Sequence, residues 1–127
     1  MNMLPKTAKI MIVDDMKMIR TSIRKYLNTL GYENIVEAVD GEDAVKKYAS
    51  EKPAFIFMDV VMPNIPGDAA LKIIREGDKK TPIVMLTSVA EKSVMDACTK
   101  EGILGYILKP LTLESGPKIL ADMLEKA

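Results

Sequence analysis

Histidine is absent from the 127 residues. The chain therefore has no Ser-His-Asp or Cys-His nucleophile pair, no histidine metal ligand and no histidine phosphodonor. Any metal site must use oxygen ligands, with the single cysteine, Cys98, as a remote exception. Oxygen ligands point to hard cations such as Mg²⁺, Ca²⁺ or Mn²⁺.

Cysteine, net charge and long apolar runs are also scarce or missing. With one cysteine no intrachain disulfide can form, which fits a reducing, cytoplasmic compartment. The formal net charge is zero, so bulk charge does not favour nucleic-acid or membrane binding. The apolar run from Ile10 to Val13 stops at two acids, which indicates neither a signal peptide nor a membrane span.

The residues that are present indicate a globular α/β protein. Hydrophobic residues make up 48% of the chain and charged residues 28%, and the length favours one domain over residues 1–127. Segments with helical spacing separate the short apolar runs, and no repeat or interdomain linker interrupts them. The predicted strands are Lys9–Val13, Asn34–Ala38, Ala54–Met58, Pro82–Leu86 and Leu104–Leu108.

Apolar spacing and turn residues mark the five helices. Asp40-Gly41 is expected to open the second helix, Gly31 to end the first, and Ser115 to cap the fifth. The alternation predicts a parallel sheet with helices on both faces, a flavodoxin-like (βα)5 fold. The simplest doubly wound strand order is 2-1-3-4-5.

Polar groups end four of the predicted strands. They are Asp14-Asp15, Asp59, Thr87-Ser88 and Lys109-Pro110. In the order 2-1-3-4-5 these groups share the edge of the sheet where such folds bind ligands. Three clustered carboxylates repel one another unless a cation lies among them, so the pattern predicts a metal site there.

Each of these groups has a plainer interpretation when it is taken alone. Asp14-Asp15 or Thr87-Ser88 could cap a helix, and Asp59 could be a turn residue before Pro63. Lys109-Pro110 could lie in an exposed loop. Their joint placement at four strand ends favours a functional site.

Four stretches, IMIVDDMKMIR, FMDVVMPNIPG, IVMLTS and GYILKP, resemble the response-regulator receiver domain, especially its single-domain chemotaxis type, CheY. The resemblance extends from Lys9 to the last helix. It implies that Asp59 accepts a phosphoryl group from a phosphohistidine of a sensor kinase. It also implies that Asp15 binds Mg²⁺ (or Mn²⁺) directly, Asp14 through water, and Val61 through its backbone carbonyl.

The resemblance implies roles for the remaining strand-end residues. Lys109 would pair with the phosphoryl oxygens, with a cis bond to Pro110, and Thr87 and Ser88 would lie in the phosphoryl-binding and switch region. Tyr106 would be the aromatic residue that changes rotamer with Thr87. The surface remodelled by this switch would be formed by the fourth helix, the fifth strand and the fifth helix.

Two valines depart from the usual pattern. Val61 and Val89 follow the phosphoacceptor and the switch hydroxyl by two residues and would flank the path of the hydrolytic water. Neither side chain can orient a water molecule by hydrogen bonding, so slow self-dephosphorylation is expected.

The expected function is therefore a phospho-accepting response regulator, most simply in chemotaxis. Its partners would be a histidine kinase, a downstream target and a phosphatase. No effector domain is expected, nor any enzymatic activity beyond its own phosphorylation and dephosphorylation, and a monomer is expected. Three alternatives stay open: a phosphorelay intermediate, a degenerate receiver used for docking, and a Mg²⁺-dependent phosphohydrolase with an aspartyl nucleophile. The haloacid-dehalogenase type of hydrolase would need an acid where Val61 stands.

Overall fold

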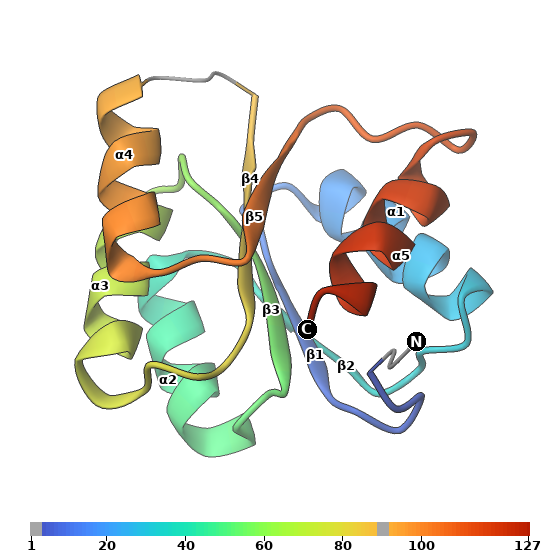
Figure 1. The fold of residues 1–127 in the computed structure, drawn as a ribbon, viewed down its shortest axis with the longest axis horizontal. Coiled ribbons are helices and arrows are strands. Elements are labelled where there is room, and N and C mark those ends of the chain that lie inside the picture. Colours follow the sequence, from blue (N-terminus) through green and yellow to red (C-terminus); the bar gives the residue numbers. More distant parts are fainter. Residues whose placement is uncertain (1–3, 89–91) are drawn as a thin grey trace.

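The computed structural model describes residues 4–88 and 92–127, in which five strands alternate with five helices (Figure 1). The strands are β1 (Ile10–Val13), β2 (Ile35–Ala38), β3 (Phe55–Asp59), β4 (Ile83–Thr87) and β5 (Gly105–Leu108). The helices are α1 (Lys17–Thr29), α2 (Gly41–Glu51), α3 (Gly67–Gly77), α4 (Lys92–Glu101) and α5 (Gly116–Glu125). Each strand begins one residue later than predicted, and β3 and β4 each end one residue later.

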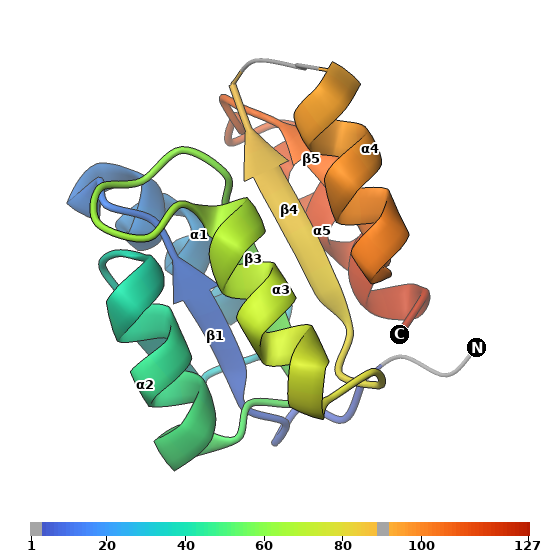
Figure 2. The ribbon, with the colours of Figure 1, turned by 90° about the vertical axis from the view of Figure 1, so that its left-hand side faces the viewer.

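The strands form one parallel sheet in the order β2-β1-β3-β4-β5, which confirms the predicted topology. Helices α1 and α5 cover one face, and α2, α3 and α4 cover the other (Figure 1). Figure 2 shows the latter three side by side in front of the sheet. Among the described residues no helix is long and apolar enough to cross a membrane.

The apolar strands divide their side chains between two cores because successive residues of a strand point to opposite faces. Met11 and Val13 of β1 pack under α2, α3 and α4, whereas Ile10 and Ile12 pack under α1 and α5. The same alternation runs through β3 and β4, where every residue is buried. This two-sided burial explains why the strands are almost continuous apolar runs.

The helix ends follow two of the three predictions. Asp40 caps α2 by accepting a hydrogen bond from the Asp43 backbone N–H at 2.8 Å. Gly31 follows α1 with a φ of +99°, a left-handed conformation that glycine adopts readily. Ser115 occupies the predicted N-cap position of α5, but the expected capping bond is absent, because its side chain pairs with Thr112 instead.

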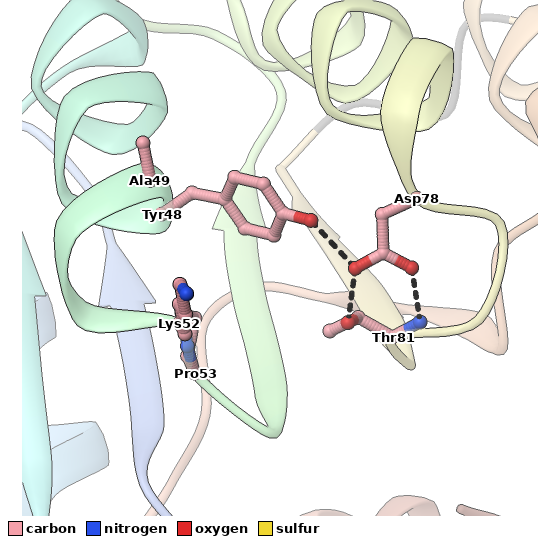
Figure 3. Close-up of a pocket in the computed structure, with 6 residues that line it drawn as sticks. All are labelled: Tyr48, Ala49, Lys52, Pro53, Asp78 and Thr81. Atoms are coloured by element: carbon pink, nitrogen blue, oxygen red, sulfur yellow. Dashed lines mark hydrogen bonds between the residues drawn. The ribbon is translucent and has the colours of Figure 1, made fainter.

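A hollow of about 290 Å³ lies between the end of α2 and the loop before β4 (Figure 3). The Tyr48 hydroxyl crosses it and donates to the Asp78 carboxylate at 2.6 Å. Asp78 also accepts hydrogen bonds from the backbone N–H groups of Lys80 and Thr81 and from the Thr81 hydroxyl. This end of the molecule is at the amino ends of β3 and β4, away from the strand ends that carry the predicted site.

Candidate functional site

The sheet brings the predicted site residues to one edge. Asp59 is the last residue of β3 and Thr87 the last residue of β4. Asp14 and Lys109 are the first residues after β1 and β5. Because these four strands are parallel neighbours, their carboxyl ends all lie on the same side of the sheet, where open α/β folds bind ligands.

Three carboxylates meet at this edge. Asp14, Asp15 and Asp59 each offer an oxygen atom, and these oxygens lie within 4.8 Å of one another. Asp14 is completely buried and Asp59 is 4% exposed, whereas Asp15 is open to solvent. The cluster therefore has two acids that solvent cannot screen and one that faces outward.

Lys109 supplies the positive charge that the buried acids need. Its Nζ lies 3.1 Å from Asp14 Oδ2 and 3.2 Å from Asp59 Oδ1. Burial alone would lower the pKa of Lys109, but the hydrogen bond to Asp14 and the charges of both acids outweigh it and raise that pKa. The ammonium group is therefore held in its charged form between the two carboxylates.

One cation does not fully compensate the two buried acids. Burial and the neighbouring charge of Asp14 raise the pKa of Asp59, although Lys109 and a hydrogen bond from the Val61 backbone N–H act in the opposite direction. Like charges at short range disfavour ionisation unless another cation joins them. A further positive ion at the site would therefore favour the ionised form of Asp59.

The acids do not act as caps for α1. Asp14 Oδ1 accepts a hydrogen bond from the Met16 backbone N–H at 2.9 Å, and Met16, the residue before the helix, makes no side-chain cap. The plainer interpretation of Asp14-Asp15 as a helix cap is therefore wrong. Asp14 contacts Lys109 instead, and Asp15 joins Asp14 and Asp59 in the carboxylate cluster.

The donor set suits a hard divalent cation. An octahedral Mg²⁺ has bonds of about 2.0–2.1 Å and so holds adjacent oxygens about 3 Å apart and opposite ones about 4 Å apart. The three carboxylate oxygens lie within 4.8 Å of one another, so small side-chain movements would bring them to that spacing, and the exposure of Asp15 leaves room for the water ligands that Mg²⁺ retains. The residues present therefore fit the ion, with no nitrogen or sulfur ligand in the cluster.

Of the predicted switch residues, Thr87 follows Leu86, which pairs in register with Asp59, whereas Tyr106 lies on the edge strand β5. Thr87 is 1% exposed, and its carbonyl accepts a hydrogen bond from the Lys109 backbone N–H at 2.7 Å. Tyr106 on β5 pairs in register with Met85 and is 46% exposed. Ser88 is exposed beside Thr87. The Lys109-Pro110 peptide bond is cis, which confirms that prediction.

The two valines are described only in part. Val61 follows β3, donates its backbone N–H to Asp59 and leaves 68% of its surface exposed. Val89 lies outside the described residues. The structure thus shows an exposed apolar side chain two residues after Asp59, while the predicted water path stays a prediction.

Two further residues contact this site without having been predicted to. Arg20 donates to the Asp14 backbone carbonyl at 2.8 Å, and Gly67 opens α3 directly against the Asp59 backbone. A charged residue between apolar neighbours, Glu37 in β2, was the available indication that a basic partner such as Arg20 must lie nearby. No sequence pattern indicated the close approach of Gly67.

The chain is similar to known proteins over most of its length. The family model of the response regulator receiver domain matches residues 10–121. The chain is 34% identical to the chemotaxis protein CheY of Bacillus subtilis (strain 168) over 102 residues, covering 80% of this chain and 85% of that protein. It is 31% identical to the chemotaxis protein CheY of Listeria monocytogenes over 94% of this chain and 97% of that protein.

Solved structures with the same fold include chemotaxis proteins. Chemotaxis protein CheY4 of Vibrio cholerae is similar with a TM-score of 0.82 and 32% identity, covering 92% of this chain and 98% of that chain. A chain of the CheX-CheY-BeF3-Mg²⁺ complex of Borrelia burgdorferi has a TM-score of 0.84 and 27% identity, covering 93% of this chain and 87% of that chain.

Proposed function

Because the chain belongs to the response regulator receiver domain family, we propose that it is a phospho-accepting signalling protein in which Asp59 carries the phosphoryl group. The observation that carries this proposal is the position of Asp59, nearly buried at the end of β3 within reach of Asp14, Asp15 and the Lys109 ammonium. A nucleophile, a metal-binding acid pair and a fixed positive charge are the groups that phosphoryl transfer needs.

Asp59 acts as the nucleophile. A carboxylate oxygen of Asp59 forms a bond to phosphorus while the bond between phosphorus and the donor nitrogen of a phosphohistidine breaks. The electron pair of the broken bond stays on the imidazole of the donor, which takes up a proton. The products are an acyl phosphate on Asp59 and a neutral histidine on the kinase.

The neighbouring residues stabilise the transferred group. Lys109 already contacts Asp59 and can follow the phosphoryl oxygens as they gain charge. Asp15 and Asp59 would hold Mg²⁺ directly, together with the Val61 carbonyl, while Asp14 would do so through water. When bound, this ion neutralises charge on the phosphoryl oxygens and orients the group for in-line transfer.

Phosphorylation would then change a partner-binding surface. The new phosphoryl oxygens offer acceptors to Lys109 and to the Thr87 hydroxyl, and an inward movement of Thr87 would leave space for Tyr106. Tyr106 and Leu108 expose 46% and 58% of their surfaces on the edge strand β5. A target protein binding to α4, β5 and α5 would sense this change.

The relatives support a role in chemotaxis. Both curated relatives are named chemotaxis proteins, and one similar structure holds CheY with CheX, BeF3 and Mg²⁺. We therefore propose a histidine kinase as donor, a chemotaxis target on the α4-β5-α5 surface and a dephosphorylating partner. A phosphorelay intermediate would use the same site, with a histidine of a second protein as acceptor.

Labelling with radioactive acetyl phosphate tests the phosphorylation site. In the presence of Mg²⁺ the wild type should become labelled, and Asp59→Asn should lose the label. Asp68→Asn is the matched control, because Asp68 is an acid in the first turn of α3 that lies outside the carboxylate cluster, so its label should persist. Full labelling of Asp59→Asn would contradict the assignment. Steady release of phosphate from a small phosphate ester would favour the phosphohydrolase instead.

A further inference from the structure

Arg20 reaches the acid cluster from the first turn of α1. Its Nη1 donates to the Asp14 backbone carbonyl at 2.8 Å, and its Nε donates to Glu37 Oε1 at 2.8 Å. The side chain is only 12% exposed. One guanidinium group therefore connects the end of β1 with the edge strand β2.

The contacted carbonyl belongs to the peptide group that joins Asp14 to Asp15. On its other side Asp14 is held by the sheet, since its N–H donates to the Ala38 carbonyl at 3.2 Å. A peptide group is planar, so a hydrogen bond to its carbonyl fixes the orientation of the whole plane. That orientation determines where the chain places Asp15 relative to Asp14.

We propose that Arg20 is a positioning residue of the metal site, which holds the Asp14-Asp15 peptide so that the exposed and the buried carboxylate face the same cation. This inference rests on the proposed function, in which these acids bind Mg²⁺. Arg20 itself does not contact the ion. It acts on the acids through the backbone, as outer partners of metal ligands commonly do.

Glu37 keeps Arg20 in place. Its two carboxylate oxygens accept from Arg20 and from Arg24, at 2.8 Å and 2.6 Å, and its own carbonyl accepts from Lys47 at 2.6 Å. Burial alone would raise the pKa of Glu37, but the two arginines outweigh that effect and lower it. Glu37 thus stays ionised, and the planar fork of Arg20 can bond it and Asp14 together.

Arg24 provides a matched control on the same helix face. It shares the Glu37 carboxylate, and its other described contact is a 3.5 Å bond to the Ile35 carbonyl, away from the acids. Arg24→Met therefore removes one ion pair with Glu37 and leaves the Asp14 carbonyl bonded. Arg20→Met removes the other ion pair with Glu37 and, in addition, the hydrogen bond to the Asp14 carbonyl.

The charge of Arg20 and its positioning role predict opposite changes in Mg²⁺ affinity when the residue is replaced by methionine. Removing a positive charge near three carboxylates strengthens their attraction for a cation. A merely electrostatic or structural role for Arg20 therefore predicts that Arg20→Met binds Mg²⁺ as tightly as the wild type or more tightly. Weaker binding reports the loss of positioning.

The test is calorimetric titration of Mg²⁺ into the full chain without any phosphodonor. For Arg20→Met we expect the Kd to rise about tenfold or more, as is typical when an outer partner of a metal ligand is removed. For Arg24→Met we expect a Kd within about twofold of wild type. Urea unfolding in the presence of a chelator should show both variants folded under the titration conditions, with the larger loss of stability in Arg20→Met because it also loses the bond to the Asp14 carbonyl.

If the methionine variant fails to fold, Arg20→Lys serves as the second variant, because it keeps the positive charge and much of the aliphatic stem. One ammonium group cannot reproduce the two-armed contact, so its Kd should also rise severalfold. Wild-type affinity in Arg20→Lys or Arg20→Met, or an equal loss in Arg24→Met, would overturn the inference and leave the proposed function intact. Absence of Mg²⁺ binding by the wild type would overturn both.

Discussion

At the scale of single residues, Asp59 and Asp14 are carboxylates that would be too costly to bury without a cation beside them. Lys109 lies between them, and no described buried side-chain nitrogen or oxygen lacks a hydrogen-bond partner. Two buried negative charges nevertheless face one positive charge, and Asp15 adds a third carboxylate from the solvent side. The remaining negative charge would attract a divalent ion to this place.

Under the proposed function, the lifetime of the phosphorylated state should depend on the residues beside the path of the hydrolytic water. Val61 is exposed and apolar, and Val89, which lies outside the described residues, is the second valine that the family resemblance associates with that path. The double substitution Val61→Asn and Val89→Glu supplies groups that can orient water. If one restored contact lowers the barrier by about 1.4 kcal/mol, the phosphorylated form should decay about tenfold faster at saturating Mg²⁺.

The control for this comparison is the pair Val61→Ala and Val89→Ala, which opens the path without adding a polar group. Decay of the Asn-Glu variant at the wild-type rate, with normal labelling and metal binding, would show that the valines do not limit hydrolysis. Fast decay of the alanine pair would show that they act by blocking water.

At the scale of elements, the β3-α3 loop is held against the sheet at a distance that only glycine permits. A Cβ atom on Gly67 would lie 1.9 Å from the Asp59 carbonyl oxygen and 2.9 Å from the Val60 Cα. The Gly67 N–H also donates to the Val60 carbonyl at 2.8 Å. The start of α3 thus lies directly against the backbone of Asp59, the proposed phosphoacceptor.

Gly67→Ala should therefore disturb the site as well as the fold. The clash is with backbone atoms that cannot rotate away, so we expect a loss of about 1–3 kcal/mol or more in the free energy of unfolding, together with weaker Mg²⁺ binding. Gly77→Ala at the other end of the same helix is the control. Its Cβ would meet nothing within 4 Å, so it should be neutral or stabilise by about 0.5–1 kcal/mol. Equal effects of the two substitutions in urea unfolding would refute this account.

Asp78 ties α2 to the loop between α3 and β4 at the opposite end of the sheet (Figure 3). Hydrogen bonds from Thr81 and Tyr48 hold the pKa of this carboxyl well below its usual range. Burial of the phenol and its hydrogen bond to Asp78 raise the pKa of Tyr48 to about 12. Asp78 is therefore ionised, and Tyr48 remains a donor, at neutral pH.

Asp78→Asn should lower the free energy of unfolding at pH 7 by about 1–3 kcal/mol, because an amide cannot accept from all the donors that surround the carboxylate. Tyr48→Phe, which removes one of these bonds, should cost about 1 kcal/mol. Urea unfolding of both variants beside the wild type gives these values.

The contribution of Asp78 should also depend on pH. Since its pKa is lower in the folded protein, the stabilisation is fully present above the unfolded value of about 3.9 and is lost as the pH falls further toward the folded value. The stability difference between wild type and Asp78→Asn should therefore stay constant from pH 7 to about pH 5 and narrow below about pH 4. A difference that is unchanged at pH 3 would contradict this.

At the scale of the whole molecule, the fold could be predicted because hydrophobic pattern and topology rules both act on complete elements. Continuous apolar runs such as Phe55–Met58 require burial on both faces, and parallel strands require helical crossovers. The strand order then brought Asp14, Asp59 and Lys109 together without any knowledge of their contacts. Which residues form the site followed from where the strands end.

Contacts between elements were harder to predict because they depend on side-chain reach rather than on periodicity. Arg20 and Glu37 lie on different elements, and so do Tyr48 and Asp78. The chemistry of Ser115 was misjudged for a similar reason, since the nearby Thr112 hydroxyl competes for its side chain. A single sequence shows that such groups need partners but does not show which ones they find.

The central claim is that Asp59, Lys109 and the acid pair form one Mg²⁺-dependent phosphoryl site that controls the β5 surface. Titration with beryllofluoride, a phosphoryl analogue, followed by amide NMR, tests it most directly. We predict saturable shifts at Asp59, Thr87 and Tyr106 with Mg²⁺, and none without Mg²⁺ or in Asp59→Asn. Shifts that persist in Asp59→Asn, or a wild type that does not respond with Mg²⁺ present, would contradict the claim.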